Sequence, residues 1–279
     1  MKKIIAAFDG LKFSESTLKY AVHIAKLTDA HLVGVFLDDI TYTSYKIYEV
    51  VTTEGASREK LNEYEKKDTD TRDKAVSAFE NACRIAGINH SIHRDRNVAV
   101  QELLHESVFA DLLIIDKKET LTHYEEKIPT RFIRDLLTDV QCPVLIAPEK
   151  YNPVDKVIFL YNGEPSSVYA IKMYSYLFTI KEYTAAEVVS VRSVDDSLHV
   201  PDNYLMKEFM KRHFSNVEYK VLKGIAADEV AHYLKEQTPN TLVISGAYER
   251  GRVSRWLRTS MADMLMKEFK LPLFIAHTK

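Results

Sequence analysis

The sequence contains the same pattern twice, and this internal repeat limits the possible folds more than any other feature. An apolar run that ends in Asp-Gly occupies residues 3–10, and a similar run that ends in Asn-Gly occupies residues 156–163. Neither run alternates between apolar and polar residues, which is typical of a strand that is buried on both faces and followed by a turn. Later runs recur in the same order: residues 111–115 with 241–245, and 143–147 with 272–276. The repeat predicts two copies of one domain.

Helical patterns lie between the predicted strands. In the first copy, apolar residues share one helix face over residues 18–25, and Ser14 is the expected N-cap. In the second copy, apolar residues at 171–178 follow the same spacing. Strands that alternate with helices predict a mainly parallel sheet with helices on both faces. We therefore expect two α/β domains, at residues 1–149 and 155–279, joined by a short linker.

The composition excludes several classes of protein. With 279 residues the chain is long enough for two cores, and its 38 Lys and Arg against 40 Asp and Glu leave a net charge of -2. A near-neutral chain has no overall field that attracts nucleic acid or an anionic membrane, so we expect neither as a partner. Two cysteines make no disulfide framework, and the first apolar run is too short for a signal peptide. We expect a cytoplasmic protein.

The two copies differ most between their second and third strands. In the first copy this stretch is long, and residues 55–74 are densely charged with mixed sign, whereas residues 193–216 of the second copy are shorter. Mixed charge of this kind is usually solvated surface, so we interpret residues 55–74 as an exposed helical extension. A docking arm for a protein partner is the alternative.

Three pieces of sequence carry a resemblance to a known family. They are AFDG at 7–10, CPVLIAP at 142–148, and ISGAY at 244–248, which continues to a Thr-Ser pair at 259–260. In this order and in two copies, they resemble the universal stress proteins over nearly the whole chain. The resemblance implies two tandem Rossmann-like domains with adenine nucleotide alpha hydrolase-like topology. Each would be a five-stranded parallel sheet in the order 3-2-1-4-5 with helices on both faces.

The resemblance also implies that some members bind ATP, through a Gly-x2-Gly-x9-Gly-Ser/Thr motif after the fourth strand. Glycines let backbone N–H groups approach phosphate, and the helix N-terminus that follows favours negative charge. In the first domain the motif falls on Asp116, Glu119, Pro129 and Thr130, so every glycine is lost. The carboxylates repel phosphate and proline lacks an N–H. We predict that this domain does not bind ATP, although Asp9 and Thr130 remain from the family's site.

The second domain keeps more of the motif. Gly246 holds the first glycine position and Ser260 the hydroxyl position, while Gly251 lies close to the position where Glu249 replaces the second glycine. Arginines crowd the same segment, and guanidinium groups near a helix N-terminus can hold phosphate. Against this, an asparagine stands where the first strand of ATP-binding members ends in a carboxylate. By resemblance, the residue at 191 contacts the base through its backbone. The candidate nucleotide-binding residues are Asn162, Val191, Gly246, Arg250, Gly251, Thr259 and Ser260.

The remaining sequence offers no catalytic constellation. No Cys or His spacing suggests a metal site, and no Gly-x-Ser-x-Gly elbow anchors a hydrolase triad. We therefore expect a non-catalytic stress-response protein that acts through protein contacts. The alternative is an ATP-binding sensor or weak ATPase that uses the second domain, with ATP as the one candidate cofactor. A dedicated enzyme on this fold has no residues to support it.

The last strand of each copy is expected to lie at a sheet edge. Residues 144–146 and 273–275 are apolar, and an exposed edge of this kind needs a cover. By resemblance the family dimerises through this strand, which predicts a pseudo-dimer inside the chain in which the two last strands pair. A homodimer of the whole chain is a further option.

Overall fold

The computed structural model describes residues 1–37, 52, 58–95, 99–122, 124–178, 185–246 and 261–276. The chain forms two compact units, residues 2–141 and 142–279, and Met1 is grouped with the second. The first unit therefore ends before the last strand of the first repeat, whereas the sequence places that strand inside a domain of residues 1–149.

Across the part of the first unit that the structure describes, four parallel strands lie in the order β3-β2-β1-β4. They are β1 (Lys3–Asp9), β2 (His31–Leu37), β3 (His90–Asp95) and β4 (Leu112–Asp116). From Ile4 to Asp9, β1 is fully buried, which confirms that its unbroken apolar run belongs to a strand covered on both faces. In the parallel register Asp9 lies beside Leu37, so the carboxyl ends of β1 and β2 lie at the same edge of the sheet.

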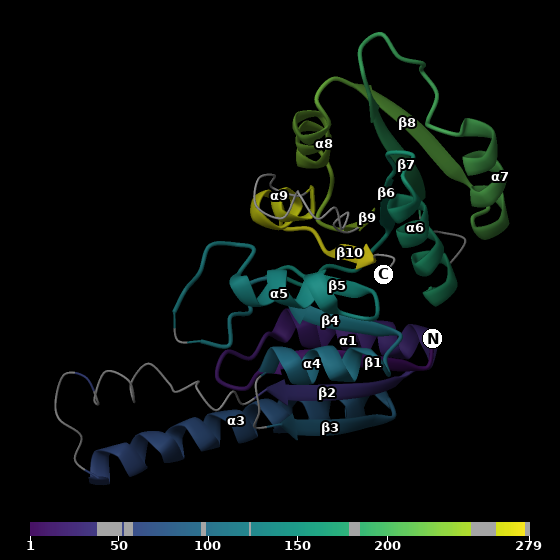
Figure 1. The fold of residues 1–279 in the computed structure, drawn as a ribbon. Coiled ribbons are helices and arrows are strands. Elements are labelled where there is room, and N and C mark those ends of the chain that lie inside the picture. The colour runs from purple at the N-terminus through teal and green to yellow at the C-terminus, as the bar shows by residue number, and fades with distance from the viewer. Residues whose placement is uncertain are drawn as a thin grey trace. The chain divides into compact units, whose positions relative to one another are not determined.

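Within the described ranges, the helices of the first unit alternate with the strands, as the sequence predicts (Figure 1). They are α1 (Glu15–Thr28), α3 (Arg58–Ala86), α4 (Ala99–Ser107) and α5 (Arg131–Asp139). The predicted N-cap is confirmed, because the Ser14 hydroxyl accepts a hydrogen bond from the Thr17 N–H at 3.2 Å. Right-handed crossovers place α1 and α3 on one face of the sheet and α4 and α5 on the other, and each pair is in contact.

An aromatic cluster fixes α3 on the sheet. Phe79 of α3 packs edge-on against Phe8 of β1 and Phe36 of β2, with ring centroids 5.8 and 5.9 Å apart. The Phe79 ring can enter because Gly34 has no side chain: a Cβ at Gly34 would lie 2.8 Å from it. This contact holds the C-terminal part of α3 on the strands. The described part of the charged segment, from Arg58 onward, is helical, as the sequence predicts.

In its described residues, the second unit contains six strands in the order β5-β10-β9-β6-β7-β8. They are β5 (Val144–Ala147), β6 (Lys156–Leu160), β7 (Ala185–Arg192), β8 (Val217–Lys223), β9 (Thr241–Gly246) and β10 (Leu273–Ala276). The five strands of the second repeat are parallel and follow the predicted order 3-2-1-4-5, read from β8 to β10. Their helices are α6 (Pro165–Leu177), α7 (Asn203–His213), α8 (Ala226–Lys235) and α9 (Met261–Glu268).

The predicted pairing of the two last strands is confirmed. β5 runs antiparallel to β10, with Leu145 opposite Phe274, and all four residues of each strand are buried. This pairing covers the edge that β10 would otherwise expose. It also explains why β5 belongs to the second compact unit.

Among the described residues, no helix is both long enough and apolar enough to cross a membrane.

Candidate functional site

Three of the predicted nucleotide-binding residues lie together in the second unit. Asn162, Val191 and Gly246 line one pocket of about 140 Å³, at the carboxyl ends of β6, β7 and β9. The carboxyl edge of a parallel sheet is where α/β proteins bind their ligands. The other predicted residues lie outside the described part of the chain: Arg250, Gly251, Thr259 and Ser260. The described walls alone enclose less than the ~300 Å³ that is usual for a small-molecule site.

Gly246 brings the end of β9 against the start of α6. A Cβ at this position would lie 2.8 Å from the carbonyl carbon and oxygen of Ser166 and 2.9 Å from the backbone nitrogen of Ser167. Backbone atoms of a helix start cannot yield as a flexible side chain can, so the close approach requires glycine. This packing accounts for Gly246 whether or not a phosphate binds nearby.

Asn162 holds the turn between β6 and α6. Its Oδ1 accepts a hydrogen bond from the Glu164 N–H at 3.0 Å. Asp9 does the same after β1, where its Oδ1 accepts from the Leu11 N–H at 2.8 Å. Asp and Asn are favoured in turns for this contact, so the exchange of one for the other between the two repeats preserves the turn. Asn162 differs from Asp9 in charge, and it is exposed where Asp9 is fully buried.

Sequence reasoning missed several polar residues near this pocket. Ser166 and Ser167 begin α6 and line it, and Ser167 is held by a hydrogen bond from its hydroxyl to the Glu164 carbonyl at 2.7 Å. Arg192 directly follows Val191, and its Nε is buried and lacks a hydrogen-bond partner among the described residues. Burial raises the pKa of Tyr161, a lining residue, and the Arg192 charge opposes the shift. The sequence could have pointed to Arg192, because it directly follows Val191, which is one of the predicted nucleotide-binding residues.

In the first unit, Asp116 replaces the glycine that begins the motif, and its side chain closes the loop after β4. Its Oδ2 accepts a hydrogen bond from the Ser14 hydroxyl at 2.7 Å, and its Oδ1 accepts from the Lys118 N–H at 2.8 Å. One carboxylate therefore ties the end of β4 both to the start of α1 and to its own loop.

Glu119, at the second glycine position, turns its side chain back into the loop. Its Oε1 accepts hydrogen bonds from the Thr120 and Leu121 N–H groups at 2.9 and 3.0 Å. Leu121 has a φ of 50°, so successive N–H groups converge on one acceptor, as they do in anion-binding nests. Here the acceptor is a side chain of the protein. These N–H groups are the kind that cradle phosphate in a glycine-rich loop.

The Glu119 carboxyl lies in a strongly acidic, buried environment. Burial and then the nearby Asp9 raise its pKa from 4.5 to about 8, and Asp116 contributes further. Both aspartates act on Glu119 because the loop after β4 folds against the end of β1. The structure thus brings together the three acidic residues that the sequence places at the degenerate motif and its remnant: Asp9, Asp116 and Glu119.

Thr130, the other predicted remnant of the family's site, is the N-cap of α5. Its hydroxyl accepts a hydrogen bond from the Ile133 N–H at 3.2 Å and donates one to the Glu119 carbonyl. Both contacts are structural and join the loop to the helix that follows. Within the described ranges, no group of three or more His, Cys, Asp or Glu residues is arranged to hold a metal ion.

Comparisons with known proteins agree with the repeat and the fold. No family model matches the chain. Its sequence is similar to that of a universal stress protein of Synechocystis sp., with 17% identity over 289 residues that cover 98% of this chain and 99% of that protein.

Solved structures show the same fold. A universal stress protein from Archaeoglobus fulgidus is similar with a TM-score of 0.70 and 13% identity, covering 99% of this chain and 98% of that one. A functionally unknown protein from Pseudomonas aeruginosa is similar with a TM-score of 0.63 and 14% identity, covering 99% and 92%. The sequence match spans the whole of both proteins and the repeated α/β fold agrees with it, so the chain is similar over its whole length to universal stress proteins with two tandem domains.

Proposed function

We propose that this chain is a universal stress protein that is non-catalytic and acts in the stress response through contacts with other proteins. The observation that carries the proposal is the hydrogen bonding of Glu119. Its side chain accepts hydrogen bonds from the two loop N–H groups that a bound phosphate would need. These two hydrogen bonds close the loop with a side chain of the protein itself. Protein contacts are further supported by large apolar side chains that are exposed in the connection after β7 and in the first turn of α7: Val194, Leu198, Tyr204 and Leu205.

The first unit is accordingly proposed not to bind ATP. The two loop N–H groups already donate to Glu119. Asp9 and Asp116 also add negative charge beside the loop, which opposes a phosphate at close range. NMR provides the test, with magnesium and ATP added to the whole protein. The amide signals of Asp9 and Thr130 are expected to stay in place, and saturable shifts at both would contradict the proposal.

The absence of enzymatic turnover is part of the same proposal. Catalysis needs a positioned nucleophile or acid–base group. Asp9 and Asp116 both accept loop hydrogen bonds, and Asn162 in the second unit cannot exchange a proton as a carboxylate does. Phosphate release from ATP with magnesium, by protein purified away from contaminating ATPases, is expected to be far below the typical enzyme rate of about 10 per second. A rate near that value that Asp9→Ala or Ser260→Ala abolishes would overturn the proposal.

The second candidate function is an ATP-binding sensor or weak ATPase that uses the second unit. One observation favours it: Asn162, Val191 and Gly246 line a single pocket at the carboxyl edge of the sheet. Four more predicted residues are outside the described part of the chain, among them Arg250 and Ser260. The direct measurement is whether the purified protein retains a nucleotide, detected by absorbance and mass spectrometry.

Calorimetry tests the predicted role of Arg250. If it pairs with a phosphate group, Arg250→Ala should weaken ATP binding by about 1.5 to 3 kcal/mol, the range for charged hydrogen bonds. Arg212→Ala is the matched control, because Arg212 lies exposed on α7. Equal affinities of wild type and Arg250→Ala would remove Arg250 from the site, and no heat from either protein would favour the non-catalytic contact function.

A further inference from the structure

The edge strand β8 carries two charged side chains without an ion pair inside the described part of the chain. β8 is the last strand in the sheet order, and among the described residues β7 is the one strand beside it (Figure 1). Glu218 and Lys220 are both exposed and have no ion-pair partner among these residues. Lys223 is different, because its Nζ donates to the carbonyl oxygens of Ser193 and Ser197, each at 3.1 Å. An open strand edge of this kind can pair with a strand of another molecule.

The side chains of β8 alternate between the two faces of the sheet, and their contacts show which face each one meets. Tyr219 faces α7, where the Lys207 Nζ lies 5.5 Å from its ring centroid. Lys220 faces α8, where its Nζ lies 4.2 Å from the ring centroid of Tyr233. Burial raises the pKa of Tyr233 and the charge of Glu218 adds to the shift, which places Glu218 on the α8 face as well. A lysine over an aromatic ring keeps its charge, so Lys220 remains able to pair with a carboxylate.

The sequence of β8 is complementary to itself in one antiparallel register. If two copies of β8 pair about a two-fold axis at Tyr219, Glu218 of each copy lies opposite Lys220 of the other. On the α7 face, Val217 then lies opposite Val221, and these apolar side chains are only partly buried in the single chain. Opposite charges across a strand pair attract, and apolar pairs remove surface from water. Both faces of the strand therefore favour the same register.

The registers on either side of this one place like charges together. A two-fold axis at Glu218 would set that carboxylate opposite itself, and an axis at Lys220 would set two ammonium groups opposite each other. A slip by one residue would bring the α7 face of one copy beside the α8 face of the other, because side chains alternate with a period of two. Charge and alternation together select the register centred on Tyr219.

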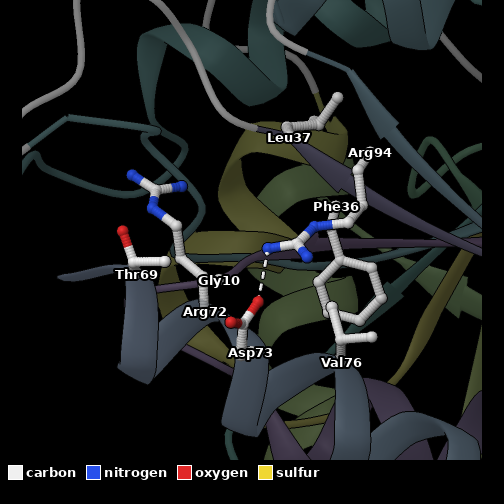
Figure 2. A pocket seen from close by; sticks show the side chains of 8 residues that line it. All are labelled: Gly10, Phe36, Leu37, Thr69, Arg72, Asp73, Val76 and Arg94. Atoms are coloured by element: carbon white, nitrogen blue, oxygen red, sulfur yellow. Dashed lines mark ion pairs between the residues drawn. The ribbon is translucent and has the colours of Figure 1, made fainter. Parts of the chain in front are cut away.

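The other edge strand, β3 of the first unit, does not offer the same surface. Its Arg94 reaches toward α3, where the Nη2 lies 2.9 Å from the Oδ1 of Asp73, and both residues line a pocket of about 350 Å³ (Figure 2). Its His93 contacts Glu106 of α4. These contacts hold ionisable side chains of β3 on helices of its own unit. The edge of β8 differs because Glu218 and Lys220 keep their charges for a partner outside the chain.

We propose that β8 pairs with β8 of a second copy of this chain, antiparallel about a two-fold axis at Tyr219, and that the protein forms a homodimer in this way. The pairing would continue the sheet of the second unit across the interface. Each β8 edge is used once in such a contact, so the assembly closes at two copies. The proposal concerns assembly, and it stands or falls independently of nucleotide binding.

Charge exchange tests the pairing, on the whole protein, by analytical ultracentrifugation. Wild type should associate reversibly, with dimer present by about 500 μM. Glu218→Lys and Lys220→Glu should each weaken the dimer at least about tenfold, because both opposite pairs then carry like charges. A mixture of these two variants should dimerise, since every lysine of one β8 then lies opposite a glutamate of the other. Combining both substitutions in one chain exchanges the charges and should also restore the dimer.

The matched control for Lys220→Glu is Lys172→Glu on α6, a helix that packs on β9 and β10. It makes the same change in net charge and also removes a lysine from a tyrosine ring, 5.7 Å from the centroid of Tyr176. Lys172→Glu should leave the dimer unchanged. Circular dichroism of each variant checks that the fold is kept. Amide signals that shift with protein concentration in NMR spectra should lie at residues 217–221 of β8 and not in β3.

Several results would overturn the proposal. One is a wild type that stays monomeric up to about 500 μM. Others are single variants that dimerise as tightly as wild type, or a mixture of the two that associates no better than either variant alone. Pairing of β8 with β3 of another copy would shift the signals of both strands and give species larger than a dimer. Shifts confined to residues outside β8 would assign the contact to a different surface.

Discussion

At the scale of single residues, the two repeats use the loop after their fourth strand differently. In the first unit Glu119 is an acidic side chain that is buried and hydrogen-bonded to its own loop. In the second unit Gly246 lets the strand end contact the start of α6. Both arrangements stabilise the local fold. The first also takes up the N–H donors that a phosphate ligand would require.

The raised pKa of Glu119 predicts a pH-dependent stability. The native state holds this proton to about pH 8, whereas the unfolded chain releases it near 4.5. Between these values the native state binds more protons, so the free energy of unfolding should fall as pH rises, by up to about 1.4 kcal/mol per pH unit. Glu119→Gln keeps a neutral side chain and should flatten this dependence, as measured by urea unfolding between pH 5 and 8.

The control for this experiment is Glu125→Gln, which removes an exposed carboxylate from the same connection between β4 and α5. It should leave the pH dependence unchanged. If Glu119→Gln and wild type lost stability in parallel across the range, the buried carboxyl would not be the titrating group.

At the scale of elements, a buried polar network fixes α8 on the sheet of the second unit. The Tyr233 hydroxyl donates to the Glu187 carboxylate of β7, which also pairs with the Lys156 Nζ of β6 at 2.8 Å. Lys156 in turn donates to the Gln237 Oε1 at 2.9 Å. Glu187 is 5% exposed, and a buried carboxylate needs such partners. Burial and the Glu187 carboxylate together raise the pKa of Tyr233.

Tyr233→Phe should therefore destabilise the second unit. It removes one hydrogen bond from a buried carboxylate while keeping the ring, and the loss should be about 1 to 3 kcal/mol in urea unfolding. Tyr204→Phe is the matched control, because Tyr204 is 78% exposed and should change stability by less than about 0.5 kcal/mol. Equal effects of the two substitutions would mean that the Tyr233 hydroxyl contributes nothing to the network.

At the scale of the whole molecule, β5 is the last strand of the first repeat but pairs with the last strand of the second. It lies antiparallel to β10 inside the unit formed by residues 142–279. A strand that covers a neighbour's edge stabilises the sheet and removes a surface prone to aggregation. The two repeats are thus linked by strand pairing as well as by the chain between them.

This arrangement predicts where the chain can be divided. A fragment of residues 142–279 should unfold at a higher urea concentration than a fragment of residues 155–279, because only the longer one retains the apolar cover of β10. The shorter fragment should also associate in solution, measured by analytical ultracentrifugation, since its β10 edge is open. If the two fragments unfolded at the same urea concentration and had the same state of association, β5 would contribute little to the second unit.

Much of the fold follows from local patterns in the sequence. The unbroken apolar run before Asp9 indicates a strand buried on both faces, and the Ser14 cap lies next to the helix it begins. These signals depend on residues that are close along the chain, which periodicity and capping rules describe. The repeat then extends each assignment to the second copy, including the strand order that β6 to β10 confirm.

The site depended on contacts that only the tertiary structure decides. Sequence reasoning placed Glu119 beside the phosphate position as a source of repulsion, but the structure shows its carboxyl accepting the loop N–H groups. Arg72 and Arg94 lie on different elements and line one pocket beside α3, whose Phe79 packs against Phe36 of β2. The sequence alone determined the elements and their repetition, because these arise from local spacing. The tertiary structure decided which side chains meet, because that depends on the packing of residues far apart in the chain.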